Sequence, residues 1–258
     1  AAEVGARFGN ELTSAGVDDA RGFLVEQILN GKNALQPWAG LAGGVLCRQL
    51  QRQGAVHPAL ETLRRVLRSA VENERSPERV GAYALAAGMA HSLESAPRLM
   101  KLLQRELQDD ARGQVALGLA LLGHGEAIEP LRAIVAGAKY RPELLRQGAM
   151  ALAILGDKDI AESLAGMLKE ARSLASQAAI ASALGFIGDR RSIDPLLALL
   201  GDRLVTERAR TFAAVALGNV ADKEPVPWNA KIGDGLNYRA APPTLSDPLS
   251  GTGILDIY

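Results

Sequence analysis

A short sequence motif recurs four times between residues 111 and 221, and its spacing sets the length of a structural repeat. The pairs that close its copies are Leu122-Gly123, Leu155-Gly156, Ile187-Gly188 and Val220-Ala221, and successive copies are 33, 32 and 33 residues apart. A fixed period of this length is typical of repeat proteins, in which each unit buries its apolar face only by stacking on its neighbours. The chain is therefore predicted to fold as a stack of similar units.

Two positions before each closing residue are small in every copy. Seven residues before it stand Ala116, Ala149, Ala181 and Ala214, and three residues before it stand Ala120, Ala153, Gly185 and Gly218. Because these positions are four residues apart, they share one face of a helix. Each copy is thus predicted to contain a helix whose small-residue face allows a neighbouring helix to approach closely.

A turn and a second helix follow each of these helices. Glycine suits the left-handed conformation that ends a helix, and the aspartates that follow Gly156 and Gly188 can accept hydrogen bonds from the N–H groups that begin the next one. The second helices carry the apolar pairs Leu131/Val135, Leu164/Leu168 and Leu196/Leu200 at i, i+4 spacing. Each repeat is then a hairpin, whose members we call the first-type and the second-type helix.

Two stretches resemble the bacterial HEAT-like repeats that are also found in phycobilisome-lyase-like proteins. They are residues 149–160, AMALAILGDKDI, and residues 181–196, ASALGFIGDRRSIDPL. The resemblance covers roughly residues 76–222 and implies an all-α, right-handed α-solenoid of helix hairpins. It does not imply one activity, since such proteins serve as scaffolds, inhibitors, nucleic-acid binders and some enzymes.

The chain is predicted to have three segments. Residues 1–34 form a lead-in and a capping helix, residues 35–222 form the HEAT-like repeats, and residues 223–258 form an extended, largely non-helical tail. The repeats amount to about five hairpins and a last first-type helix from Thr206 to Val220. The tail contains five prolines but is too apolar for an ordinary linker. We expect it to cap its own last helix pair or to dock on a neighbouring protein.

Composition excludes several classes of protein. Lys+Arg and Asp+Glu both number 29, so no overall charge draws nucleic acid or an anionic membrane. No apolar run approaches the roughly 20 residues that span a bilayer. The chain begins Ala1-Ala2-Glu3, without Met. We expect a soluble protein, either cytoplasmic or, if this start reflects signal cleavage, periplasmic or secreted.

Few residues suggest catalysis or metal binding. Cys47 is the single cysteine, which excludes an internal disulfide, and its apolar helix predicts a buried, inert thiol. His91 and His124 are 33 residues apart and are expected at the same place in successive turns, and like His57 they are interpreted as capping residues. The His-Glu dipeptides of deoxyhypusine hydroxylases are absent from the sequence. We therefore predict no catalytic residue, metal or cofactor.

The favoured function is a non-enzymatic scaffold or adaptor subunit that binds another protein. In HEAT-like repeats the second-type helices line the concave side, so the resemblance places their cations in a groove. The candidate partner-binding residues are Arg65, Arg68, Arg98, Lys101, Arg105 and Arg132 on these helices, and Trp228, Tyr238, Ile254, Leu255, Ile257 and Tyr258 in the tail.

Two alternatives stay open. A chromophore-lyase-like or chaperone-like protein would bring Tyr83, Tyr140 and the histidines to one cavity. A nucleic-acid-binding protein would use the cations of the second-type helices as a local basic groove, although such a site also calls for aromatic contacts.

Overall fold

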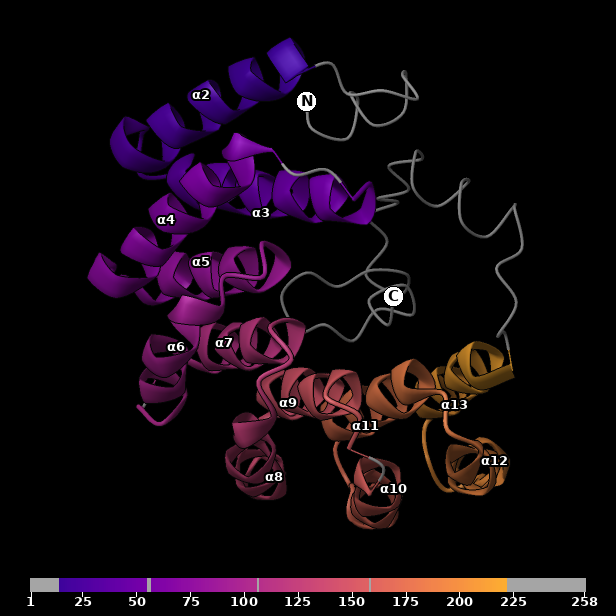
Figure 1. The fold of residues 1–258 in the computed structure, drawn as a ribbon. Helices are drawn as coiled ribbons and strands as arrows, with labels where there is room; N and C mark the ends of the chain where they lie inside the picture. The colour runs from indigo at the N-terminus through magenta and orange to yellow at the C-terminus, as the bar shows by residue number, and fades with distance from the viewer. Residues whose placement is uncertain (1–13, 55–56, 106, 158, 222–258) are drawn as a thin grey trace. The chain divides into compact units, whose positions relative to one another are not determined.

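The computed structural model describes residues 14–54, 57–105, 107–157 and 159–221, which contain twelve α-helices and no strand (Figure 1). The helices are α2 (Ser14–Asn30), α3 (Gln36–Arg52), α4 (Pro58–Asn73), α5 (Pro77–Met89), α6 (Ala96–Leu103), α7 (Asp109–Leu121), α8 (Ile128–Gly137), α9 (Pro142–Ile154), α10 (Ile160–Glu170), α11 (Leu174–Ile187), α12 (Ile193–Gly201) and α13 (Glu207–Ala221). The predicted all-α fold is confirmed. In chain order, five helix pairs from α3–α4 to α11–α12 precede α13, as expected.

Several helices begin where the sequence provides a proline or a capping side chain. α4 begins at Pro58, and the N–H of Ala59 donates to Nδ1 of His57 at 3.1 Å. Proline is tolerated in the first turn because its missing N–H has no helical partner there. The hydrogen bond from Ala59 confirms the capping role predicted for His57. α4 ends at Asn73, and α5 begins at another proline, Pro77.

The chain divides into two compact units, Ala1–Leu131 and Arg132–Tyr258, which we call the N-terminal and the C-terminal unit. In the N-terminal unit the first-type helices α3, α5 and α7 pack in a row, and α4 and α6 lie against one side of it (Figure 1). In the C-terminal unit α9, α11 and α13 form the row, and α10 and α12 lie against it. Each unit is a two-layer stack of hairpins, the arrangement of an α-solenoid.

Glycines set the close approach of neighbouring first-type helices. A Cβ added to Gly118 would lie 2.4 Å from the carbonyl oxygen of Ala84, and one added to Gly185 would lie 3.0 Å from the Cα of Ala216. Interiors as densely packed as those of proteins leave no room for such contacts. The small-residue face predicted at Gly185 is thus confirmed. Gly218 holds the same register in α13, the last described helix, and an added Cβ there meets no described atom within 4 Å.

The turns between paired helices follow the predicted chemistry, with one exception. Gly123, Gly156 and Gly188 adopt φ values of 71°, 82° and 64°. In the turn after α5 this left-handed conformation belongs to His91, with φ 54°. The predicted equivalence of His91 and His124 is therefore wrong by one residue. The reason is that these two turns are one residue closer in sequence than the 33-residue period, so His91 corresponds to Gly123.

The C-terminal segment lies outside the described residues. It includes all the tail residues predicted to bind a partner, from Trp228 to Tyr258. Their role and the predicted segment boundaries therefore stay predictions.

Candidate functional site

The segments that join a second-type helix to the next first-type helix follow one another along one edge of each unit. They are residues 74–76 and 104–108 in the N-terminal unit, where residue 106 is not described, and residues 138–141, 171–173 and 202–206 in the C-terminal unit. We call this the connection edge. Three clefts open on it, each between two successive connections. The repeat therefore reproduces one kind of cleft at equivalent places.

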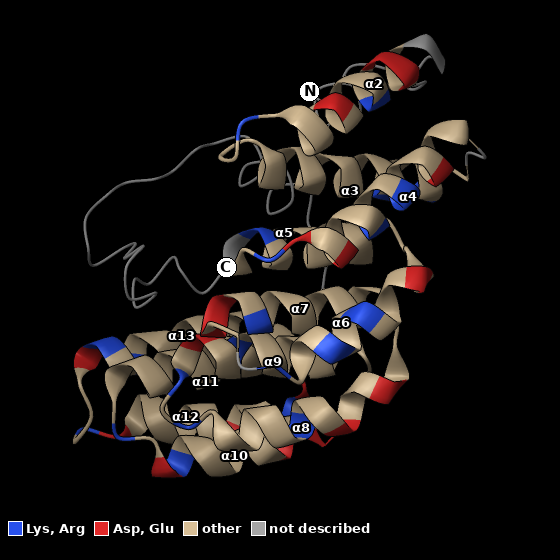
Figure 2. Ribbon diagram, turned by 90° about the vertical axis from the view of Figure 1, so that its left-hand side faces the viewer, with Lys and Arg blue, Asp and Glu red and all other residues tan. Residues whose placement is uncertain are grey.

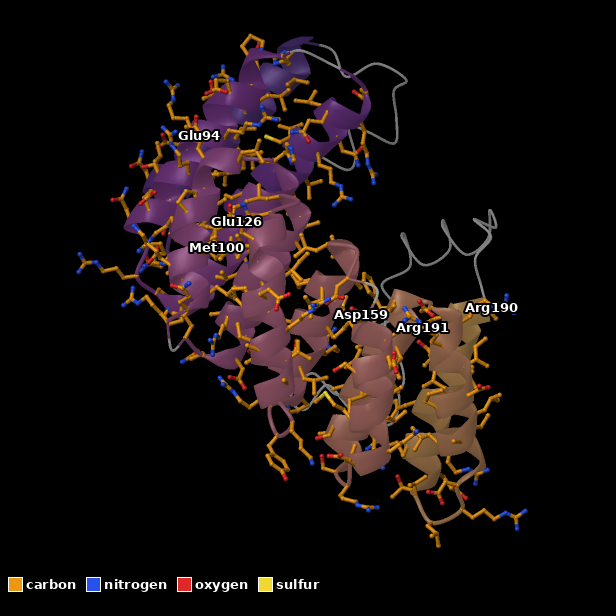
Figure 3. All side chains as sticks on the ribbon, turned by 60° about the horizontal axis from the view of Figure 1, so that its bottom comes forward. Glu94, Met100, Glu126, Asp159, Arg190 and Arg191 are labelled. Atoms are coloured by element: carbon orange, nitrogen blue, oxygen red, sulfur yellow. The ribbon has the colours of Figure 1, made fainter. Side chains whose placement is uncertain are left out.

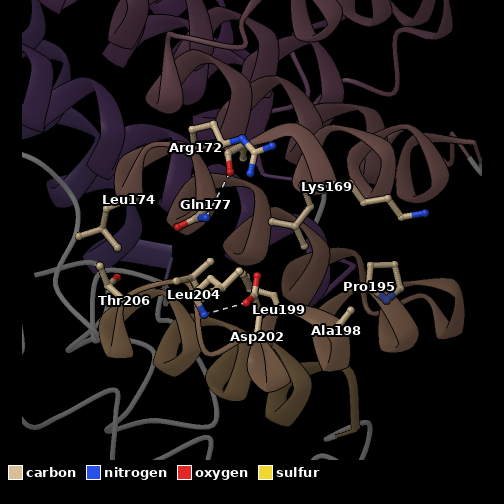
Figure 4. A pocket seen from close by; sticks show the side chains of 13 residues that line it. Lys169, Arg172, Leu174, Gln177, Pro195, Ala198, Leu199, Asp202, Leu204 and Thr206 are labelled. Carbon is tan, nitrogen blue, oxygen red and sulfur yellow. Dashed lines mark hydrogen bonds between the residues drawn. The ribbon is translucent and has the colours of Figure 1, made fainter.

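The large cleft, of about 460 Å³, lies between the connections 171–173 and 202–206 (Figure 4). Its apolar lining is Leu168, Ala171, Leu174, Pro195, Ala198, Leu199, Leu204 and Val205, and its polar lining is Lys169, Arg172, Gln177, Asp202 and Thr206. Gln177 Nε2 donates to the carbonyl of Ala171 at 3.2 Å, and the N–H of Leu204 donates to Asp202 at 2.8 Å. These bonds give both connections a defined shape. The Leu204 side chain is 97% exposed on the rim.

The small cleft, of about 270 Å³, adjoins the large one. Both are lined by Ala171 and Arg172, so these two residues form the wall between them. The remaining lining of the small cleft is Lys139, Tyr140, Met167, Glu170, Ser173, Ser176 and Ile180. Lys139 pairs with Glu170 at 2.9 Å, and this hydrogen bond raises the pKa of Lys139. Tyr140 is 85% exposed. The two clefts together form one preformed double site.

The connection edge of the C-terminal unit carries excess positive charge. Its three connections hold Lys139, Arg141, Arg172 and Arg203 but a single acid, Asp202. Lys169 and Arg172 are exposed on the rim of the large cleft and make no ion pair with any described residue. The rim of the double site is therefore electrostatically complementary to anionic groups.

The turns between paired helices lie elsewhere and contain several ion pairs. In the C-terminal unit Arg132 pairs with Asp157 and with Asp159, and Arg191 pairs with Asp189 at 3.0 Å. Asp159 and Arg191 lie next to each other in Figure 3. These ion pairs reduce the net charge that this side of the unit presents.

The N-terminal cleft, of about 420 Å³, brings two of the predicted cations together. Arg98 and Arg105 line it with Glu72, Glu74 and Arg75. The buried Nε of Arg98 has no hydrogen-bond partner among the described residues. Burial alone would raise the pKa of Glu74, but the N–H groups of Ser76 and Arg75, with nearby Arg79, lower it overall. This cleft therefore contains fixed charges of both signs.

The other predicted cations are dispersed. Arg65 and Lys101 are exposed and line none of the three clefts. Arg68 forms an ion pair with Glu94, and Arg132 pairs with Asp157. Figure 2 shows acidic segments interspersed with the basic ones on and beside α4 and α6. Partner binding by these cations stays a prediction.

The side chains considered for catalysis have other surroundings. Cys47 is fully buried, and this burial raises the pKa of its thiol to about 12 against the opposing charge of Arg64. The predicted burial of Cys47 is confirmed. Tyr83 is buried in the N-terminal unit, whereas Tyr140 is exposed on the C-terminal unit. Within the described ranges, no three His, Cys, Asp or Glu side chains are grouped as a metal site requires.

The hairpin that builds half of the large cleft also carries the match to a known family. A family model, the PBS lyase HEAT-like repeat, matches residues 176–202, which include most of α11, the turn and α12. Residues 176–202 thus form a HEAT-like repeat. No curated protein matches it. The matched HEAT-like repeat supplies Gln177, Pro195, Leu199 and Asp202 to the large cleft, so the site is part of the repeat itself.

Apart from Tyr140, the residues of the double site were not predicted from the sequence, although the sequence contains a signal for them. The connections of the C-terminal unit are rich in cations, and they also hold the large apolar side chains Tyr140 and Leu204. Exposed apolar side chains that gather on one face indicate an interaction site. Separately, no described helix has the length and apolar character that crossing a membrane requires.

Proposed function

We propose that this HEAT-like repeat protein is a non-enzymatic scaffold or adaptor that binds another protein through the connection edge of its C-terminal unit. The observation that supports this best is the pair of adjoining clefts with apolar walls and, on the rim, two cations, Lys169 and Arg172, that pair with no described residue. Stacked hairpins offer extended, preformed surfaces of this kind. A preformed surface lowers the entropic cost of binding.

The polar groups of the double site support binding rather than catalysis. A nucleophilic mechanism needs a hydroxyl or thiol within reach of a base. In the small cleft Ser173 donates to the hydroxyl of Ser176 at 2.8 Å, and Ser176 donates to the carbonyl of Lys139 at 3.1 Å. In the large cleft the carboxylate of Asp202 accepts the N–H of Leu204. These groups hold the connections in shape.

The test is recovery of partners by the full-length protein, combined with chemical cross-linking and mass spectrometry. We expect cross-links from a specific partner at Lys139 and Lys169. The double variant Arg172→Glu, Leu204→Ser should recover about tenfold less of that partner, because it reverses a rim charge and removes an apolar contact. Arg65→Glu, at another exposed cation, on α4, is the matched control. A partner lost only in Arg65→Glu would contradict the proposal and favour the second-type helices.

A lyase-like or chaperone-like role is the second candidate, supported by the description of the matched repeat as a PBS lyase HEAT-like repeat. Incubation of the full-length protein with a bilin would test it. A stable change in bilin absorbance that is lost in Tyr140→Ala would support this role. An unchanged spectrum would count against it.

A further inference from the structure

We infer that the two clefts of the C-terminal unit together bind one acidic peptide segment in the polyproline II conformation, with apolar side chains at positions i and i+3. This inference rests on the proposed protein-binding function and names the kind of segment that the partner presents. It follows from the spacing of the clefts, from their lining and from the charges between them.

The spacing expected between clefts one repeat apart agrees with this conformation of the ligand. The large and small clefts are one repeat apart and share the wall formed by Ala171 and Arg172. Packed helices are about 8–10 Å apart. A polyproline II segment has three residues per turn and rises about 3.1 Å per residue, so residues i and i+3 project from the same side roughly 9 Å apart. In a β-strand these two residues would point to opposite sides.

The backbone requirements of the ligand agree with this conformation. A peptide that binds as a β-strand needs the free edge of a sheet for its hydrogen bonds. The described part of the C-terminal unit is helical, so its connection edge offers side chains and short turns instead. A polyproline II segment makes no ladder of hydrogen bonds and keeps its own backbone solvated. Such a segment can therefore lie across the two clefts without leaving its backbone N–H and C=O groups unsatisfied.

The lining of each cleft defines its side-chain preference. Leu168, Leu174, Leu199 and Val205 give the large cleft aliphatic walls, which suit a Leu or Met side chain. The small cleft has a smaller volume and is lined by Met167, Ile180 and the exposed ring of Tyr140. It suits a second aliphatic side chain that packs against that ring. Apolar anchors that enter pockets carry most of the binding energy in such contacts.

The charges place acidic residues between and beside the two anchors. Arg172 stands on the wall that the clefts share, and Lys169 stands on the rim of the large cleft. Both are exposed and without ion pairs within the described ranges. A carboxylate at i+1 or i+2 of the bound segment lies over this wall. The connection edge then binds a segment with apolar residues at i and i+3 and an acidic residue at i+1 or i+2.

The test measures fluorescence anisotropy of labelled synthetic peptides with the full-length protein. One peptide carries a Leu-Glu-Pro-Leu core between acidic flanks, and the other has the same composition with a Leu-Glu-Leu-Pro core. We expect the first to bind about tenfold more tightly, because only its leucines match the spacing of the clefts. The comparison uses the unmodified protein, so it does not depend on the folding of a variant.

Variants then locate the binding. Arg172→Glu should weaken binding of the first peptide about tenfold, whereas Arg65→Glu should leave it unchanged. Equal binding of both peptides, or binding that Arg172→Glu does not affect, overturns the inference. Tighter binding of single-stranded oligonucleotide at the same edge, with loss in moderate salt, also overturns it in favour of a nucleic-acid surface.

The outcomes separate this inference from the proposed function. Partner cross-links that lie on another face, and persist in Arg172→Glu, leave the scaffold function standing and refute the peptide site. If no partner is recovered but the first peptide binds, the result contradicts the scaffold function and supports the peptide site. If no partner is recovered and the first peptide does not bind, both the scaffold function and the peptide site are refuted.

Discussion

Arg132 and Asp157 form a bidentate ion pair in the C-terminal unit. Nε and Nη2 of Arg132 donate to the two carboxylate oxygens of Asp157, each at 2.7 Å. The Asp157 side chain is 1% exposed, whereas that of Arg132 is 40% exposed. Arg132 belongs to α8 and Asp157 to the turn after α9, so the pair ties one repeat to the next.

Replacement of Arg132 should destabilise the protein. Arg132→Ala leaves a buried carboxylate without its charged donor, and we expect a loss of about 2 kcal/mol in the free energy of unfolding. Arg132→Lys keeps the positive charge, so it should recover part of this loss. The recovery should be incomplete, because an ammonium group cannot make the bidentate contact. Urea unfolding followed by circular dichroism measures the effect. Arg203→Ala, at an exposed arginine, is the control, and equal midpoints for the two alanine variants would contradict the prediction.

The same pair should make stability depend on pH. The hydrogen bonds from Arg132 lower the pKa of Asp157, with help from the N–H of Asp159 and against the effect of burial. Because the folded-state pKa lies below the unfolded value of about 3.9, the stabilisation is complete above that value. It is lost as the pH falls through the folded-state pKa.

Unfolding of the wild type and of Asp157→Asn, measured from neutral pH to about pH 3, tests this dependence. The stability difference between the two should be constant at neutral pH and should shrink in acid. A constant difference throughout would show that the carboxylate charge contributes nothing.

Two glycine substitutions of the same kind should have opposite effects. Gly118→Ala forces a methyl group against the backbone of Ala84, and overpacking of this kind costs about 2 kcal/mol. Gly218→Ala adds a methyl group where no described atom lies within 4 Å, and the higher helix propensity of alanine should stabilise α13 by about 0.8 kcal/mol. Thermal unfolding compares both with the wild type. A stabilised Gly118→Ala protein would mean that α5 and α7 tolerate a wider separation.

The Cys47 thiol should be inert in the folded protein. It is fully buried, and its pKa of about 12 keeps it protonated at any pH compatible with the fold. We expect no reaction with a thiol-specific reagent under native conditions and rapid, stoichiometric reaction in denaturant. Fast native labelling that does not track unfolding would reveal a local opening of α3.

The amino-acid sequence by itself determined the repeat and its helices. The helical period and the closing glycines depend on contacts between residues close in sequence, so the sequence alone predicts them. The last first-type helix, predicted from Thr206 to Val220, runs from Glu207 to Ala221. The wrong pairing of His91 with His124 shows the limit of prediction from the sequence. A repeat that is one residue shorter moves the left-handed position without changing the apolar pattern.

The tertiary structure alone decided which charges remain free and where clefts open. Arg68 and Arg132 are similar cations in sequence, yet each pairs with an acid in the next repeat, Glu94 or Asp157, whereas Arg172 forms no ion pair with any acid in the described ranges. The large cleft forms because two connections about thirty residues apart come together when the hairpins stack. The periodic pattern specifies that hairpins stack, but the positions of long polar side chains depend on the distances between repeats, which only the packed structure sets.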